Sequence, residues 1–176
     1  MASANSGRTS AAFFLPHLRP GLRLLDCGCG VGSITIGLAA AVAPGEVIGL
    51  DLEPGQIDQA RALAREHGVA NVTFRVGSVY DLPFADGAFD AAFAHTLLMH
   101  LHRPIVGLRE IKRVLRPGGV IGVADDDQGT MLLSPAVPLV QEFLVLHQRW
   151  LVRCAVPTRL WHVIIARRWW RPASFA

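Results

Sequence analysis

The segment LLDCGCGVG, residues 24–32, constrains the fold of this chain more than any other feature. An apolar run that carries Asp26 leads directly into three glycines at alternate positions. Glycine adopts positive φ easily and lets a ligand approach the backbone without a Cβ in the way. A strand, a glycine-rich turn and then a helix are typical of the first unit of an open α/β sheet, in which ligands bind past the carboxyl ends of the strands. A plain tight turn between a strand and a helix is the alternative interpretation.

Apolar runs alternate with helix-forming segments along the first two thirds of the chain. Strands are expected at residues 22–27, 46–52, 71–76, 89–94 and 120–124. Helices are expected at residues 33–43, 54–67 and 104–115, with a further helix at 137–151 and a short one at 6–18 that Pro16 ends. This alternation predicts a doubly wound α/β domain with a parallel sheet that helices cover on both faces.

Composition excludes several other classes of protein. The chain has 176 residues, of which 51% are hydrophobic and 18% are charged, as expected for one globular domain. No apolar run reaches the roughly 18 residues of a membrane span, and no signal peptide is visible. Three cysteines do not make a disulfide framework, so a cytoplasmic location is expected. Cys27 and Cys29 lack the second pair of ligands that a zinc site needs, and no metal is predicted.

The spacing of the glycines, together with one acidic residue, limits the classes of ligand that this turn is expected to bind. The dinucleotide fingerprint is G-x-G-x-x-G, whereas Gly28, Gly30 and Gly32 form G-x-G-x-G and Ser33 follows. Asp51 closes the second expected strand, where a carboxylate can accept hydrogen bonds from both hydroxyls of a ribose. An ordinary surface aspartate is the alternative. The pattern favours a ligand that contains a nucleoside and disfavours a nicotinamide cofactor.

Four landmarks in order resemble the class I S-adenosylmethionine-dependent methyltransferases, in particular the ubiquinone/menaquinone-methyltransferase-like group. They are LLDCGCGVGSITIGLA, VIGLDLEPGQIDQAR, VGSVYDLPFADGAFDAAFAHTLLMHL and LREIKRVLRPGGVIGVAD. One such match is weak, but four at the right spacing are strong. The resemblance covers residues 15–127 and implies a Rossmann-like sheet with five parallel strands in the order 3-2-1-4-5.

The resemblance also implies a cofactor, S-adenosyl-L-methionine, and a role for each matching residue. The glycine turn, with Cys29, would pass under the methionine part of the cofactor, and Asp26 would help to hold that turn. Asp51 would bind the ribose and Leu52 would pack on the adenine. Ser78 stands where many members have an aspartate that binds the adenine amino group, so Ser78 and the backbone of Val79 would take that role. The residues implied in cofactor binding are Asp26, Gly28, Cys29, Gly30, Gly32, Asp51, Leu52, Ser78, Val79 and His95.

The reaction implied is transfer of a methyl group to a small-molecule acceptor. His95 stands where donor and acceptor meet in the family and is the candidate catalytic residue, while His100 and His102 are further candidate bases. Asp125, with the two aspartates after it, is expected to form the polar end of the fifth strand near the substrate. A binding domain without turnover and an NAD-dependent oxidoreductase are the alternative functions. The sequence names neither the acceptor nor the oligomeric state.

No nucleic-acid partner is expected, because the basic residues of the helix at 104–115 are predicted to form a solvated face. These residues are Arg109, Lys112 and Arg113, followed by Arg116.

The end of the sequence departs from the family pattern. After Glu142 there is no acidic residue, whereas six arginines and all four tryptophans follow. We divide the chain into a cofactor-binding domain at residues 1–150 and an atypical tail at 151–176. The tail does not resemble the two strands, 6 and 7, that usually follow strand five. It is interpreted as a truncated or frameshifted product, or as a basic aromatic segment that contacts a membrane or nucleic acid. Strand five is then expected to be an exposed edge, with marginal solubility.

Overall fold

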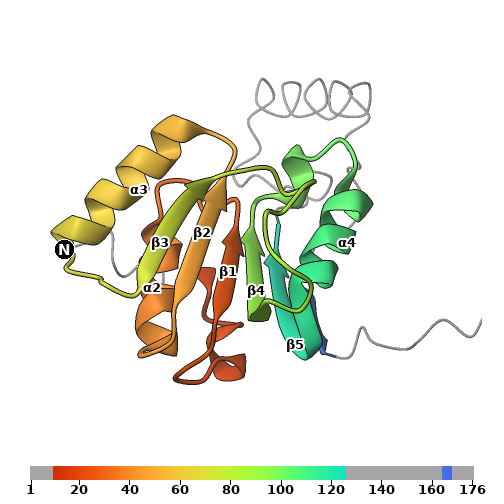
Figure 1. The fold of residues 1–176 in the computed structure, drawn as a ribbon, viewed down its shortest axis with the longest axis horizontal. Coiled ribbons are helices and arrows are strands. Elements are labelled where there is room, and N and C mark those ends of the chain that lie inside the picture. The colour runs from red at the N-terminus through yellow and green to blue at the C-terminus, as the bar shows by residue number, and fades with distance from the viewer. Residues whose placement is uncertain (1–9, 126–163, 168–176) are drawn as a thin grey trace, which may run out of the picture.

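The computed structural model describes residues 10–125 and 164–167 as a six-stranded sheet with helices on both faces (Figure 1). The strands are β1 (Leu24–Cys27), β2 (Val47–Asp51), β3 (Val72–Val76), β4 (Phe89–His95), β5 (Leu115–Ala124) and β6 (Ile164–Arg167). The helices are α2 (Ser33–Val42), α3 (Pro54–Glu66) and α4 (Pro104–Val114), with the short 3-10 helices η1 (Leu15–His17) and η2 (Leu98–His100).

The first five strands are parallel and lie in the order β3-β2-β1-β4-β5. The predicted sheet order is therefore confirmed. β1 at its centre is buried along its whole length, as expected for a parallel strand covered on both faces. β5 begins earlier than predicted, because Leu115 pairs with Phe89 of β4. The register is irregular between this pair and the next one, Ala91 with Val120.

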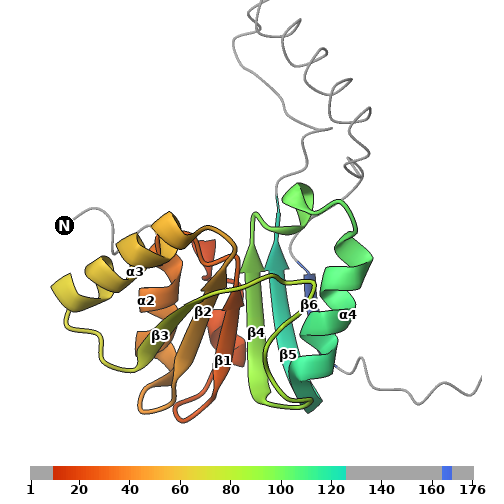
Figure 2. The ribbon, with the colours of Figure 1, turned by 45° about the horizontal axis from the view of Figure 1, so that its top comes forward.

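Helices α2 and α3 cover one face of the sheet, and α4 covers the other. Figures 1 and 2 show α2 and α3 beside β1, β2 and β3, with α4 beside β5. Leu38 and Val42 of α2 are buried with Leu24 and Phe93, whereas Ile111 and Val114 of α4 belong to a second cluster across the sheet. The carboxyl ends of the strands lie at one edge of the sheet, between these two layers of helices.

The segment before β1 contributes to the core instead of lying over it. Phe14 is fully buried and stacks on Phe93, with ring centroids 5.4 Å apart. A Cβ at Gly122 would overlap the Phe14 ring, so glycine in β5 makes room for it. Within the described part of the predicted 6–18 helix, a turn leads into η1, and Pro16 lies inside η1 and does not end the helix.

The expectation that β5 forms an open edge is wrong. β6 pairs antiparallel with β5 along its central residues, from Val120 opposite Arg167 to Val123 opposite Ile164. The tail thus supplies a strand where none was expected, and this strand satisfies backbone groups of β5 that would otherwise be free to pair with another chain. The division at residue 150 stays a prediction.

The predicted helix at 137–151 lies outside the described residues. No helix within residues 10–125 or 164–167 is long and apolar enough to cross a membrane.

Candidate functional site

The glycine turn after β1 has the backbone conformation that the sequence indicates. Gly28, Gly30 and Gly32 have φ angles of 71°, 52° and 79°, all in the left-handed region. The N–H groups of Gly28 and Cys29 both donate to the carbonyl oxygen of Leu50, at 2.7 and 3.1 Å. The turn is therefore anchored to β2 before the chain enters α2 at Ser33.

Asp51 joins this turn to the end of β2. Its Oδ2 accepts the Gly30 N–H at 2.9 Å, and its Oδ1 accepts the Glu53 N–H at 3.0 Å. A carboxylate offers about four acceptor positions, so two remain for the hydroxyls of a ligand. The loops after β1 and β2 are thus held together by the side chain that the sequence assigns to ribose binding.

Asp26 lies under the turn and is only 3% exposed. Its Oδ2 accepts the Thr35 hydroxyl of α2 at 2.6 Å, so the side chain fixes the helix that follows the turn. Burial, opposed by the Thr35 hydrogen bond and assisted by the charge of Asp51, raises the pKa of Asp26 to about 7. This carboxyl group is therefore a buried acid that titrates near neutral pH.

Stability is expected to fall between pH 6 and pH 8 because of Asp26. The folded protein holds a proton on Asp26 below pH 7, whereas the unfolded chain, with a pKa near 3.8, has already lost it. The raised pKa thus stabilises the folded state at low pH, and this stabilisation is lost as pH rises, by about 1.4 kcal/mol over the two units. Urea unfolding at both pH values measures it.

The variant Asp26→Asn is the matched control for that prediction. Asparagine is uncharged at every pH and can still accept the Thr35 hydroxyl. Histidines contribute equally to the pH dependence of both proteins, so the difference between the two isolates Asp26. Equal slopes for wild type and variant would show that Asp26 is ionised throughout this range.

A cavity of about 290 Å³ opens at the carboxyl ends of the strands. Its walls are Gly28, residues 50–52 at the end of β2, residues 77–80 after β3, and Thr96, Leu97, His100 and Leu101 after β4. Leu52 is 72% exposed, although it is a large apolar side chain. An apolar surface beside a carboxylate with acceptor positions to spare suits a ligand that has a flat ring attached to a sugar.

The wall after β3 is a tight turn. Ser78 and Asp81 form an isolated antiparallel bridge, and the Ser78 hydroxyl accepts the Tyr80 N–H at 3.1 Å. Tyr80 also accepts the Arg103 N–H on its phenolic oxygen at 3.1 Å. Ser78, Val79 and Tyr80 of this turn all line the cavity.

The turn after β4 is strained. Thr96 has a φ of 52° and is the one non-glycine residue with positive φ within the described ranges. Its N–H donates to Ala124 of β5 at 2.8 Å, and its hydroxyl lies 3.0 Å from Nδ1 of His95. Strained backbone of this kind persists where the surrounding structure imposes it, often beside a ligand site.

Asp125 supports η2, which carries His100 to the cavity. Its carboxylate accepts the Leu98 N–H at 3.2 Å and the Met99 N–H at 3.4 Å. Burial raises the pKa of Asp125, whereas these two hydrogen bonds and the charges of His95 and His100 lower it. Asp125 is therefore at the polar end of β5, as expected, while Asp126 and Asp127 lie outside the described residues.

Five of the ten residues assigned from sequence line the cavity: Gly28, Asp51, Leu52, Ser78 and Val79. Asp26, Gly30 and Gly32 shape the turn from beneath or beside it, and Cys29 hydrogen-bonds weakly to its own neighbour, Gly30. His95 is not among the lining residues. The structure places Thr96, Leu97, His100 and Leu101 there, and the rule that loops at the carboxyl ends of parallel strands meet the ligand could have indicated them.

A larger hollow of about 380 Å³ lies at the opposite end of the sheet. It borders the amino ends of β1 and β4, near Leu22 and Asp90, and an ion pair between Asp90 and Arg116 lies on its wall. Doubly wound sheets bind ligands at the carboxyl ends of their strands, whereas this hollow lies at the amino ends. The cavity beside Asp51 is therefore the candidate site.

Burial raises the pKa of both Cys27 and Cys29, so neither thiol is activated as a nucleophile or as a metal ligand. Within the described part of the chain, no group of three histidine, cysteine or acidic side chains is arranged to hold a metal ion.

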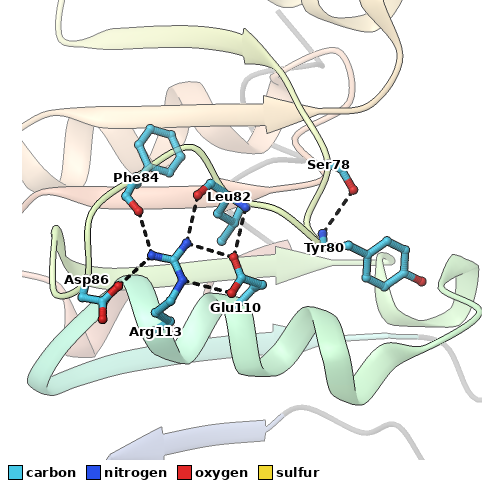
Figure 3. A network of polar contacts seen from close by, with 7 residues as sticks. All are labelled: Ser78, Tyr80, Leu82, Phe84, Asp86, Glu110 and Arg113. Carbon is cyan, nitrogen blue, oxygen red and sulfur yellow. Dashed lines mark hydrogen bonds and ion pairs between the residues drawn. The ribbon is translucent and has the colours of Figure 1, made fainter.

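The expectation that the basic residues of α4 form a solvated face is wrong for Arg113. Its guanidinium lies among Glu110, Asp86 and the carbonyl oxygens of Leu82 and Phe84, as Figure 3 shows. Periodicity placed Arg113 on the polar side of the helix but could not indicate that the loop after β3 folds over it.

Comparison with known proteins identifies the family of this chain. Residues 25–123 match the family described as Methyltransferase domain. An uncharacterized methyltransferase of Schizosaccharomyces pombe is 39% identical over 135 residues, which are 73% of this chain and 47% of that protein. A demethylmenaquinone methyltransferase of Symbiobacterium thermophilum is 38% identical over 105 residues, 58% of this chain and 42% of that protein.

A solved structure extends the likeness to the fold. A SAM-dependent methyltransferase from Methanosarcina mazei has a TM-score of 0.62 and 27% identity, and the match covers 68% of this chain and 59% of the other. The chain spans less than half the length of the two curated relatives. The matched region includes the glycine turn, Asp51, Ser78 and the turn after β4. The chain therefore belongs to the methyltransferase domain family, within the class I S-adenosylmethionine-dependent methyltransferases.

Proposed function

We propose that this chain binds S-adenosyl-L-methionine in the cavity beside Asp51 and transfers its methyl group to a small-molecule acceptor. The observation that carries the proposal is the meeting of Gly28, Asp51 and Leu52 around one cavity at the carboxyl ends of β1 and β2. Family membership makes this cofactor the expected one, and the residues present fit it.

The fit can be tested residue by residue. Gly28 lets the Leu97 side chain pack close to the turn, since a Cβ there would lie 2.9 Å from Cδ1 of Leu97. The remaining acceptor positions of Asp51 suit two ribose hydroxyls, and the exposed Leu52 side chain suits one face of an adenine. Ser78 and the backbone of Val79 are placed to meet the polar edge of that ring. The Ser78 hydroxyl accepts the Tyr80 N–H and keeps one acceptor position and its own donor, but it brings no charge, which favours modest affinity.

The protein's own contribution to the reaction is alignment and the exclusion of water. The cofactor supplies a methyl group on a sulfonium, which needs no further activation. Leu97 and Leu101 shield the cavity on the β4 side. His100 lines the cavity and can accept a proton from an acceptor that must lose one. The Thr96 hydroxyl meets Nδ1 of His95 and so fixes the orientation of that ring at the same turn.

Calorimetric titration of the chain tests the proposal. S-adenosylmethionine and its demethylated product are expected to bind with comparable affinity because both carry the same ribose and adenine. NAD is expected not to bind measurably, since Ser33 stands at the position of the third glycine of the dinucleotide fingerprint. Tight binding of NAD with none of S-adenosylmethionine would restore the oxidoreductase alternative.

Transfer is tested with a methyl-labelled cofactor. Demethylmenaquinone is the first acceptor to try, because a relative from Symbiobacterium thermophilum bears that name. His100→Ala is expected to slow transfer about a hundredfold to an acceptor that loses a proton, and to leave cofactor affinity within about twofold. Binding without transfer to any of a panel of acceptors would support the alternative of a binding domain without turnover.

A further inference from the structure

In the loop of residues 77–88, between β3 and β4, few backbone groups are hydrogen-bonded within a strand or a helix. Apart from the bridge between Ser78 and Asp81 it contains no strand or helix before the start of β4. Yet it packs Val79 and Leu82, 6% and 2% exposed, against the face of the sheet that α4 covers. Buried backbone N–H and C=O groups need hydrogen-bond partners, so the loop depends on side chains to provide them.

Two side chains of α4 provide these partners. Arg113 donates from Nη1 to the Phe84 carbonyl oxygen at 2.8 Å and from Nη2 to the Leu82 carbonyl oxygen at 2.9 Å. Oε2 of Glu110 accepts the Leu82 N–H at 3.1 Å. Figure 3 shows the guanidinium between the loop and the helix, with both carbonyl oxygens turned toward it.

The remaining donors of Arg113 fix its own position. Nε and Nη2 donate to the two oxygens of Glu110, at 3.0 and 2.9 Å, and Nη1 donates to Asp86 at 2.8 Å. All five N–H groups of the guanidinium are thus used. The hydrogen bond from Arg113 lowers the pKa of Glu110, which keeps this carboxylate ionised and able to accept. Lysine could not reproduce this planar, forked arrangement.

The same loop also forms part of the cavity wall, through residues 77–80, which come just before Leu82 in the sequence. Tyr80 donates its N–H to the Ser78 hydroxyl, and the Ser78–Asp81 bridge closes the turn immediately before Leu82. A displacement of Leu82 therefore moves Ser78 and Val79, which line the cavity. The contact of Arg113 and Glu110 with the loop therefore sets the position of this cavity wall, although neither of these two side chains lines the cavity.

We infer that Arg113 and Glu110 are positioning residues for cofactor binding: they hold the loop of residues 77–88 so that its wall matches the adenosine half of the ligand. This inference rests on the proposed function. If loosening the contact leaves the wall correctly placed a tenth of the time, the apparent Kd rises roughly tenfold. The weakening should be equal for S-adenosylmethionine and for adenosine, because only their shared half meets this wall.

The experiment compares Arg113→Lys and Glu110→Gln with Arg109→Ala in the full chain. Arg109 is an exposed residue of the same helix, so its replacement controls for the loss of an α4 side chain outside the contact with the loop. Kd values for S-adenosylmethionine and adenosine are measured at least 15 °C below each variant's own Tm. Hydrogen exchange is measured at the amide of Leu82, where its rate reports how firmly the loop is held. Roughly tenfold weaker binding of both ligands by Arg113→Lys, with faster exchange at Leu82 and an unchanged Arg109→Ala, is the expected result.

A purely structural role predicts something different. It would lower the Tm of Arg113→Lys and Glu110→Gln but leave both Kd values within twofold of wild type, and that outcome would overturn the inference. Failure of the wild-type chain to bind either ligand is a separate result that counts against the proposed function. Should Arg113→Lys fold poorly, Glu110→Gln keeps the shape of its side chain and carries the same test.

Discussion

Replacing Asp51 with alanine is expected to weaken the binding of S-adenosylmethionine at least a hundredfold. The carboxylate has acceptor positions for two ribose hydroxyls, and hydrogen bonds to a charged group contribute about 1.5–3 kcal/mol each. The loss of both corresponds to about two orders of magnitude or more in Kd. The substitution also leaves the N–H groups of Gly30 and Glu53 without this acceptor, so the glycine turn loses its link to β2.

Two further variants sharpen that test. Asp58→Ala removes an exposed aspartate of α3 that pairs only across the helix surface with Arg61, at 3.1 Å, and should bind the cofactor as wild type does. Asp51→Asn keeps one acceptor oxygen and should fall between wild type and alanine. Titration calorimetry measures all three, and an Asp51→Ala affinity within twofold of wild type would falsify the assigned ribose site.

The variant Gly32→Ala is expected to lower the free energy of unfolding by about 3 kcal/mol, from two additive causes. Gly32 has a φ of 79°, which costs an alanine about 1 kcal/mol or more. Its new Cβ would lie 2.9 Å from Cζ of Phe74 and 3.0 Å from the Cβ of Ala60, where α3 packs on β3. Overpacking at such a contact costs about 1–3 kcal/mol.

Gly68→Ala separates these two causes. Gly68 has a similar φ of 65° at the end of α3, but a Cβ there would meet nothing within 4 Å. Its replacement should therefore cost about 1 kcal/mol, from backbone strain alone. Urea unfolding of both variants gives the comparison. If the two substitutions cost the same, the packing of Gly32 against Phe74 contributes nothing, and its glycine is required only for the turn.

Local sequence determined the parts of this protein that depend on near neighbours along the chain. The five parallel strands follow from short apolar runs separated by helical segments, and their order follows from family resemblance. The glycine turn was predictable because positive φ selects glycine at Gly28, Gly30 and Gly32. The position of Asp51 was predictable because it closes an apolar strand, and the ends of parallel strands meet at one edge of a sheet. The assignment of Ser78 came from the family resemblance.

Tertiary structure alone decided the features that join distant segments. Periodicity assigned Arg113 to a solvated face, yet a loop 27–31 residues earlier in the chain folds over it and accepts three of its five N–H donors. Phe14 was expected in a short helix and is instead buried on Phe93, because Gly122 of β5 leaves room for its ring. β6 pairs with β5 although the sequence of the tail predicted no strand there.

The difference between what the local sequence determined and what the tertiary structure decided has one physical cause. The conformation of a glycine turn is set by the steric freedom of the residues within it, so the sequence determined that a ligand approaches the backbone after β1. The partner of a buried donor or of an edge strand depends on what the folded chain brings alongside, over separations that no local pattern encodes. The set of residues that line the cavity was therefore decided only by the way β4, β5 and the loop after β3 pack together. His100 lines the cavity and His95 does not.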